Sequence, residues 1–397
     1  MKKYDVVIAG GGPTGSTAAK EISKKGRSVL IVEKRKEIGF PNHCSGLVSP
    51  DFVSFTKMDS SLILNKIYGA ALYSYSNKVL SFKDDKVHAI VIDRVGFDRM
   101  LAHSAMENGA KYMYHSSIKN VERMNNDLRI YLETDADAIN AHLLMIASGA
   151  SSNMLKIANF KSIKGETIRT LQVEAKIELP DPNIVYVYIN NDVAHNWFAW
   201  AIPIGNGRAR IGLGTDKKEN LSTLFDILRE KWIVLKGKNI IIESKVAWII
   251  PIGFINKPFM DNIVVVGDAA REVKPFSGGG LYTGILSAHF AAEVLLSALN
   301  KKDYSEKILS HYTKLCDPPI RSKIKRGLIL RKIYKSMNDI EKEKFLLSLN
   351  NEDAKRIILD YGHIDHPFYV GYKLLKYIKS PLLNYLKSII IPDEFKS

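Results

Sequence analysis

The chain has little cysteine, little glutamine and no long apolar run. It holds 2 cysteines in 397 residues, too few for the disulfide framework of a secreted domain. No stretch reaches the roughly 18 consecutive apolar residues of a membrane-spanning helix. The N-terminal run MKKYDVVIAGGG ends in glycines without a small-residue cleavage site, which is typical of a first β-strand and not of a signal peptide. These absences favour a cytoplasmic globular protein. A single glutamine beside abundant lysine, glutamate and isoleucine is a bias seen in thermophile proteins.

Positive charge is in excess and is concentrated toward the C-terminus. The chain has 57 Lys and Arg against 42 Asp and Glu, a net charge of +15. Residues 301–397 hold 20 basic and 12 acidic residues, a net of +8, and the run 321–335 has seven basic residues and no acid. This run is either a solvated helix face or a surface for an anionic membrane or substrate. Since no zinc-finger, recognition-helix or RNA-binding signature is present, we expect no nucleic-acid partner.

Residues 4–33 combine two apolar strands with a glycine-rich turn and an intervening helix. The turn has the pattern G-x-G-x-x-G, with an acidic residue 18 positions after its last glycine. The signature residues are Gly10, Gly12, Gly15 and Glu33. The first glycine permits the sharp turn, the second lets the backbone approach a pyrophosphate, and the third lets the helix pack closely on the strand. The helix N-terminus offers N–H groups to phosphate, and Glu33 can accept hydrogen bonds from a ribose. This context predicts a dinucleotide site.

A second glycine-rich segment, residues 261–295, points to a flavin. It has an apolar strand over 263–266, Gly267-Asp268 at the carboxyl end of that strand, and three glycines that open a long helix. The segment resembles the second FAD signature of the flavoprotein hydroxylase-like superfamily. That resemblance implies that Asp268 binds the ribityl chain and that the helix start faces the flavin pyrimidine ring. A helix N-terminus there would stabilise the negative charge of a reduced flavin.

Further stretches extend the resemblance. VIDRVGFDRM (91–100) resembles the superfamily's D-R…F-D helix, whose arginine, here Arg94, approaches the cofactor. HSSIKNVER (115–123) resembles the strand whose backbone lies by the adenine, around Ile118. LLMIASGASS (143–152) resembles the strand that usually ends in G-A-D-G, but Ser151 replaces the acid, so no role is assigned there.

Residues 197–214, WFAWAIPIGNGRARIGLG, narrow the resemblance to one family. The stretch F-A-W-A-I-P followed by G-L-G resembles the motif Y-x-W-x-F-P…G-x-G of the geranylgeranyl reductases. Phe198 stands for the tyrosine and Ile202 for the phenylalanine, and Phe198 has no hydroxyl, so no proton-donor role carries over to it. PNHCSGLVS (41–49) resembles the P-x-x-C-x-G loop of the archaeal branch of that family.

The resemblance implies an α/β fold in three parts: a Rossmann-type FAD-binding domain (1–50, 91–160 and 261–300), an inserted antiparallel-sheet substrate or catalytic domain (51–90 and 161–260), and a helical C-terminal region (301–397). It implies FAD as the cofactor, bound by Gly10, Gly12, Thr14, Gly15, Glu33, Lys34, Cys44, Ser45, Gly46, Arg94, Ile118, Asp268, Gly278, Gly279, Gly280 and Leu281. It implies substrate contacts from Phe198, Trp200 and Pro203.

The implied activity is FAD-dependent reduction of isolated double bonds in geranylgeranyl chains of prenyl lipids, mostly archaeal ether lipids. The electron donor is ferredoxin or NAD(P)H, and because no second dinucleotide fingerprint is visible, NAD(P)H would bind only transiently. Two alternatives stay open: a flavin-dependent monooxygenase or halogenase of the same fold, and a non-enzymatic FAD-containing lipid-binding or electron-carrier protein.

The middle and the tail of the chain each have two interpretations. Residues 165–258 alternate in short strands, and their aromatic residues either line a dry tunnel for an isoprenoid or form the sheet core. The tail is predicted to be helical. Its stretch 369–391 interleaves lysines with apolar residues, which predicts either a helical cap over the substrate or an interfacial helix that makes a peripheral membrane contact.

Cys44 is the candidate catalytic residue. The chain has no C-x-x-C or H-x-x-x-H spacing around it, so we expect no metal site. Cys44 is either a buried packing thiol or a redox or proton-relay residue. Cys44 and a bound water are the two candidates for the general acid. Its one potential disulfide partner is Cys316, which precedes Asp317-Pro318-Pro319, an expected break between tail helices.

Overall fold

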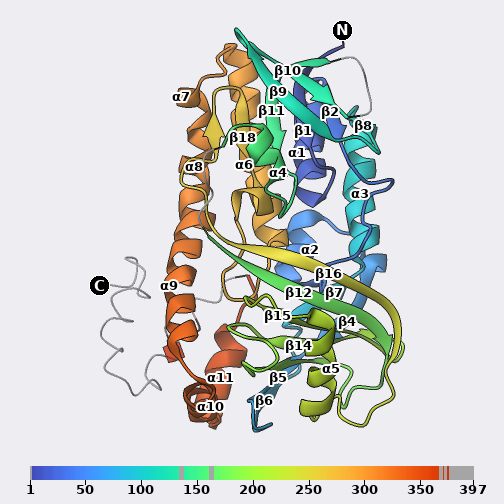
Figure 1. The fold of residues 1–397 in the computed structure, drawn as a ribbon, viewed down its shortest axis with the longest axis vertical. Helices are drawn as coiled ribbons and strands as arrows, with labels where there is room; N and C mark the ends of the chain where they lie inside the picture. The colour runs from blue at the N-terminus through green and yellow to red at the C-terminus, as the bar shows by residue number, and fades with distance from the viewer. Residues whose placement is uncertain (1, 134–137, 161–164, 366–369, 371–372, 375–397) are drawn as a thin grey trace. The chain divides into compact units, whose positions relative to one another are not determined.

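A computed structural model describes residues 2–133, 138–160, 165–365, 370 and 373–374 (Figure 1). The chain divides into two compact units, each built from three separate segments. Unit 1 consists of Met1–Phe40, Val95–Glu166 and Ile250–Lys325, and unit 2 of Pro41–Arg94, Thr167–Ile249 and Arg326–Ser397. The C-terminal residues thus divide between the units at 325/326, and residues 41–50 group with unit 2.

Unit 1 is organised around an 8-stranded sheet whose main path has the order β17-β18-β11-β1-β2-β8. Its strands are β1 (Lys3–Ala9), β2 (Val29–Val32), β8 (Lys111–Met113), β9 (Ile118–Met124), β10 (Asp127–Leu132), β11 (Ile139–Ile146), β17 (Phe259–Met260) and β18 (Ile263–Val265). The five strands from β18 to β8 pair in parallel. All four residues of β2 and the last four of β1 are buried, as expected for parallel strands that are covered on both faces.

Helices α1 and α6 pack against each other in unit 1. The helices and helical turns of this unit are α1 (Pro13–Ser23), α3 (Arg94–Glu107, whose first residue belongs to unit 2), α4 (Asn153–Ile157), η2 (Gly267–Ala270), α6 (Leu281–Lys301), α7 (Glu306–Leu309), α8 (His311–Cys316) and η3 (Asp317–Arg321). Within the described residues, α6 alone is long and apolar enough to cross a membrane, and 56% of its most apolar window is buried inside the protein. A core helix of a globular protein has the same properties.

Unit 2 contains a 7-stranded sheet in the order β16-β12-β15-β14-β13-β5-β6 and a 3-stranded sheet in the order β3-β7-β4. The large sheet consists of β5 (Gly69–Tyr73), β6 (Val79–Lys83), β12 (Gly165–Lys176), β13 (Ile184–Tyr188), β14 (Ala199–Gly205), β15 (Arg208–Thr215) and β16 (Ile241–Gly253), and the small sheet of β3 (Leu47–Val48), β4 (Ile63–Ile67) and β7 (Ala89–Ile92). The pairs β12/β15, β15/β14, β14/β13 and β5/β6 are antiparallel, as are β3/β7 and β4/β7, whereas β13 and β5 pair in parallel.

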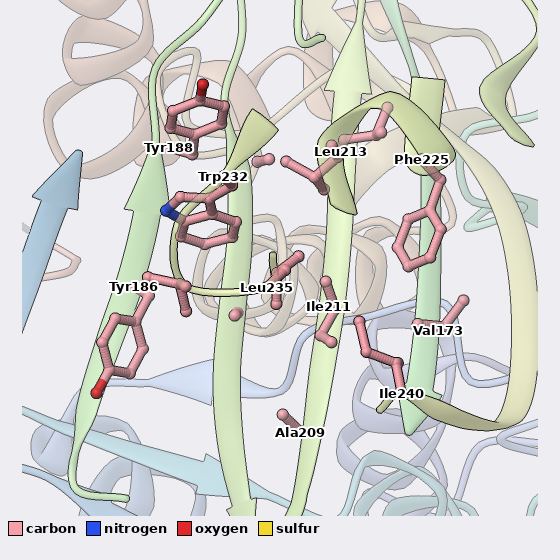
Figure 2. Packing of buried hydrophobic residues seen from close by; sticks show 14 of the residues in the cluster. Val173, Tyr186, Tyr188, Ala209, Ile211, Leu213, Phe225, Trp232, Leu235 and Ile240 are labelled. Carbon is pink, nitrogen blue, oxygen red and sulfur yellow. The ribbon is translucent and has the colours of Figure 1, made fainter. Parts of the chain in front are cut away.

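One face of the large sheet packs against α5 (Leu221–Lys231) and the segment that follows it (Figure 2). Alternate residues of β12, Leu171, Val173 and Ala175, are buried in this core together with Trp232. The alternation therefore places Gln172 and Glu174 on the opposite face of the sheet, away from the core shown in Figure 2. The other helices assigned wholly or mainly to unit 2 are α2 (Pro50–Thr56), η1 (Ser60–Leu62), α9 (Ser322–Ser336), α10 (Asp339–Ser348) and α11 (Glu352–Tyr361).

The predicted fold class is confirmed: a Rossmann-type α/β unit, an antiparallel-sheet unit inserted into its sequence, and a helical C-terminal region. The expected break at residues 317–319 is instead a π-helical turn, η3, which continues α8 directly into α9. Pro318 and Pro319 have no backbone N–H to donate, and the helix adopts the wider π-helical turn where they lie. Most of the stretch 369–391, proposed above as a cap or interfacial helix, lies outside the described residues.

Candidate active site

The first glycine-rich turn has the geometry of a phosphate site. Gly10 has φ +110°, in the region that favours glycine, and a side chain on Gly15 would collide with the Gly10 carbonyl. A Cβ on Gly12 would meet no protein atom within 4 Å. Gly12 is the N-cap of α1, and no side chain caps this helix end. The turn thus offers an uncapped, positively polarised helix N-terminus. The space next to Gly12 holds no protein side chain, so a diphosphate can approach the backbone there.

Glu33 is buried and holds the turn in place. It is 8% exposed, its Oε2 accepts the Gly11 N–H at 2.8 Å, and its Oε1 accepts the Arg35 N–H at 2.9 Å. Each oxygen retains a second lone pair, so the carboxylate can still accept a ribose hydroxyl. Among the other predicted cofactor residues, Lys34 is exposed at the end of this strand, and the Ile118 side chain lies in the core.

Thr14 brings the two FAD-type motifs together. Its Oγ1 lies 3.0 Å from the position of a Cβ on Gly267 and 2.6 Å from that of a Cβ on Gly284 in α6. Asp268 follows β18, as expected, and its carboxylate lies against Gly280, the N-cap of α6. The N-cap residue is a glycine and contributes no side-chain cap of its own. Gly278 (φ +71°), Gly279 and Leu281 complete this turn. Unit 1 therefore contains two helix N-termini whose N-cap residue is a glycine, with Thr14 in contact with both motifs, an arrangement that fits the pyrophosphate and the flavin ring of FAD.

A buried polar cluster behind Asp268 is absent from the sequence prediction. Glu272 has no exposed surface; its Oε2 accepts the Gly267 N–H at 3.0 Å, and both its oxygens accept from the Tyr312 hydroxyl at 2.8 Å. Burial raises the pKa of Glu272 to about 7, against the lowering effects of these donors and of the Arg321 charge. Only an acidic residue four positions after a G-D dipeptide signals this cluster in the sequence.

Cys316 belongs to the same cluster. It is fully buried, and burial together with the Glu272 charge raises the pKa of its thiol. Cys44 and Cys316 are both free thiols, so the hypothesised disulfide is not formed in this structure. The physical reason is the environment of Cys316, which is enclosed in the core of unit 1 and hydrogen bonds with Tyr312.

In unit 2, the loop 41–46 is anchored to the face of the large sheet that carries Gln172. The Cys44 carbonyl accepts from Gln172 Nε2 at 3.3 Å, and the Ser45 carbonyl accepts from Arg210 Nη1 at 2.8 Å. The His43 ring stacks on Trp248 with centroids 4.0 Å apart. Gly46 has φ +69°, and a side chain there would collide with the Arg210 guanidinium and the Ile92 carbonyl. This loop is partly exposed and rigidly held.

Two glycines of β15 make room for two tryptophans. Trp200 pairs with Gly212 across β14 and β15, and a Cβ on Gly212 would collide with the Trp200 indole. A Cβ on Gly214 would likewise collide with the Trp197 indole. The G-x-G motif of this family therefore has a packing reason, since each glycine leaves the space that an indole occupies.

The remaining predicted residues of unit 2 occupy different environments. Phe198 stacks on Trp197 at 5.2 Å and meets Trp200 edge-on at 6.0 Å. Pro203 is buried beside a β-bulge. Arg94 is buried next to Gly46. Cys44, Ser45, Gly46, Arg94, Phe198 and Trp200 thus share one unit, whereas Trp197, 2% exposed, is a core residue.

The two glycine turns, the parallel sheet of unit 1 and the antiparallel-sheet unit inserted into its sequence define a Rossmann-type dinucleotide-binding protein of flavoprotein architecture. A family model described as lycopene cyclase protein matches residues 5–358. The digeranylgeranylglycerophospholipid reductase of Methanocaldococcus jannaschii is 31% identical over 369 residues, covering 89% of this chain and 94% of that protein. Digeranylgeranylglycerophospholipid reductase 1 of Methanosphaera stadtmanae is 30% identical, covering 100% of this chain and 99% of that protein. The chain belongs to the lycopene cyclase protein family and to the geranylgeranyl reductases.

Solved structures agree with this placement. A geranylgeranyl bacteriochlorophyll reductase-like protein from Thermoplasma acidophilum matches with a TM-score of 0.81 and 26% identity, covering 95% of this chain and 100% of that chain. The flavin-dependent brominase Bmp2 matches with a TM-score of 0.70 at 18% identity, which shows a shared fold and nothing about halogenation. The family resemblance inferred from the sequence motifs is confirmed.

Proposed function

We propose that the protein is an FAD-dependent reductase of isolated carbon–carbon double bonds in the geranylgeranyl chains of prenyl lipids. The observation that carries this proposal is the match at about 30% identity, over nearly the whole chain, to proteins named digeranylgeranylglycerophospholipid reductase. The names of these relatives favour a reductase over the monooxygenase, halogenase and non-enzymatic alternatives.

FAD, when bound, supplies the hydride that the double bond receives. We assign its pyrophosphate to Gly12 and the start of α1, its ribose to Glu33, and its ribityl chain to Asp268. We assign the N-terminus of α6 at Gly280 to the flavin ring, where it would stabilise the negative charge of the reduced cofactor. Arg94, Ser45 and Gly46 are assigned to the same cofactor.

Phe198, Trp200 and Pro203 of unit 2 are assigned to the substrate. A trisubstituted alkene without a neighbouring carbonyl needs a proton on its less substituted carbon, which leaves tertiary cation character on the other. The aromatic faces of Trp200 and Phe198 stabilise such a charge, and Pro203 supports their strand. We assign the proton, or its relay from a bound water, to Cys44, which is partly exposed while the second thiol is buried.

The electron donor is ferredoxin or transiently bound NAD(P)H, and the protein acts in the cytoplasm, where it meets its lipid at the membrane surface. The choice of electron donor rests on the sequence, in which no second dinucleotide fingerprint is visible. The membrane contact rests on the lipid substrate and on the basic residues of the C-terminal region.

The test is anaerobic incubation of chemically reduced protein with digeranylgeranylglycerophospholipid, followed by mass spectrometry. We expect the lipid to gain two hydrogen atoms for each double bond reduced. Cys44→Ala and Cys44→Ser, with normal FAD content, should lose most of this activity. A wild-type protein that leaves the lipid unchanged refutes the function, and full activity in both Cys44 variants reduces Cys44 to a packing residue.

A further inference from the structure

Gln172 stands alone in this chain as its single glutamine and lies at an unusual position in the large sheet of unit 2. It is 4% exposed, although its strand neighbours Leu171 and Val173 point into the opposite, apolar core. An amide that is buried on a sheet face must find partners for both its ends, or it destabilises the fold. Gln172 finds both partners among residues that we assign to the reaction.

The two ends of the Gln172 amide bind Trp200 and the Cys44 loop. The Trp200 indole N–H donates to Gln172 Oε1 at 3.2 Å, and Gln172 Nε2 donates to the Cys44 carbonyl at 3.3 Å. Trp200 has little freedom besides, because its indole lies over Gly212. One side chain thus connects the aromatic surface assigned to the alkene with the backbone of the residue assigned to its proton.

Arg210 also holds the Cys44 loop on the sheet, but it does not bind Trp200. Holding the loop can therefore be distinguished from connecting the loop to Trp200. The Arg210 guanidinium is buried, pairs with Glu174 at 2.8 Å, and donates to the carbonyls of Ser45 at 2.8 Å and Ile92 at 3.2 Å. Glu174 also accepts from Asn42 at 3.1 Å. Arg210 and Glu174 therefore fix the loop to the sheet, while Gln172 is the anchor that also binds Trp200 in the described part of the chain.

We infer that Gln172 is a positioning residue: its amide sets the position of Cys44 relative to the Trp200 indole, so that proton donor and alkene-binding surface keep one geometry within unit 2. This inference rests on the proposed function for the roles of Cys44 and Trp200, but the connection itself rests on the two hydrogen bonds. Methionine at this position fills nearly the same volume and makes neither bond.

The first readout is the rate at which Cys44 is alkylated in the folded protein, followed by peptide mass mapping. Cys316 is fully buried, so labelling reports on Cys44. Gln172→Met should speed alkylation by about 5-fold, the equivalent of one net hydrogen bond lost from the loop. Turnover of the prenyl lipid should show a lower kcat with KM little changed, because the groups are misplaced and not removed.

A double-mutant cycle with Trp200→Phe tests whether the amide couples the two residues. Trp200→Phe keeps an aromatic ring but removes the indole N–H, so it should also speed alkylation of Cys44, and it should add nothing in the Gln172→Met background. Additive effects on alkylation would show that Gln172 holds the loop and Trp200 independently, which overturns the coupling.

Asn190→Leu is the matched control. Asn190 is 3% exposed in the same unit, and both ends of its amide are used, with Nδ2 donating to Tyr188 at 2.9 Å and Oδ1 accepting from the Asp192 N–H at 2.8 Å. Its loss should leave Cys44 alkylation unchanged. Equal acceleration in Asn190→Leu, or none in Gln172→Met, overturns the inference. If wild-type protein reduces no prenyl lipid while alkylation behaves as expected, the proposed function fails and the positioning by Gln172 stands.

Discussion

Glu272 is a fully buried carboxyl group next to the loop of Asp268. Its carboxyl group accepts hydrogen bonds from the backbone N–H of Gly267, which precedes Asp268, and from the Tyr312 hydroxyl. Burial raises the pKa of Glu272 from 4.5 to about 7 in the folded protein. Between these two values the folded protein holds a proton that the unfolded chain releases, so the stability contributed by this group is fully present below pH about 4.5 and is lost as the pH rises through about 7.

We predict that Glu272→Gln flattens this pH dependence. In the wild type the free energy of unfolding should fall by up to about 1.4 kcal/mol per pH unit between pH 5 and 7 on account of this group. Glutamine mimics the protonated acid and cannot ionise, so the slope should diminish. Glu293→Gln, an exposed change of equal charge on α6, is the control. The measurement is denaturant unfolding at several pH values, and equal slopes in wild type and Glu272→Gln would contradict the assignment.

At the scale of elements, different glycines in the turn between β1 and α1 serve the fold and the binding of the cofactor. A Cβ on Gly12 meets no protein atom within 4 Å, and the backbone there has φ −69°, which any residue adopts. A Cβ on Gly15 collides with the Gly10 carbonyl. The two glycines of one motif are therefore required for different reasons, Gly12 by the ligand and Gly15 by the fold.

We predict that Gly12→Ala folds normally but holds little FAD, because its methyl group lies where the pyrophosphate binds. Gly15→Ala should lose roughly 1–3 kcal/mol of stability in the cofactor-free protein as well. The checks are thermal unfolding of cofactor-free protein and FAD released by acid precipitation. Full FAD content in Gly12→Ala would place the pyrophosphate elsewhere.

Elements with a strong local pattern were predictable from the sequence. The two apolar strands expected in the region 4–33 are observed at Lys3–Ala9 and Val29–Val32. Both are apolar runs bounded by polar residues or glycine. The parallel pairing of β13 with β5 was not predictable, because its strands lie more than 100 residues apart and each alternates like an antiparallel strand. The π-helical turn at the two prolines was missed for a similar reason, since packing overrides the local preference for a break.

In the candidate site, too, some residues were predictable from the sequence and others were not. The G-x-G-x-x-G turn was found from its spacing and context, and Asp268 and the F-A-W-A-I-P stretch from their resemblance to known motifs. Gln172 and Arg210 were not assigned to the site, because a single amide or guanidinium in a strand has no sequence signature until its partners across the sheet are known. Glu272 was missed because burial, and not residue type, gives it its chemistry.

At the scale of the whole molecule, the meaning of the net charge of +15 depends on which regions carry the exposed basic residues. Lys332 on α9 and Lys344 on α10 are exposed and belong to the basic C-terminal region, whereas Lys24 and Lys25 are exposed at the end of α1. If the C-terminal region contacts an anionic membrane, local charge there matters more than total charge. Each basic residue near such a surface contributes about 1 kcal/mol, within a Debye length of roughly 10 Å.

We therefore predict that the protein sediments with liposomes containing anionic lipid, not with neutral ones, and that salt near 0.5 M releases it because the charges are then screened. The double variant Lys332→Glu and Lys344→Glu should weaken binding about 10-fold or more, since four charge units change near the surface. Lys24→Glu with Lys25→Glu makes the same change in total charge and should have a smaller effect. Equal losses in the two pairs would show that binding follows net charge alone, and binding to neutral liposomes would instead assign the contact to apolar insertion.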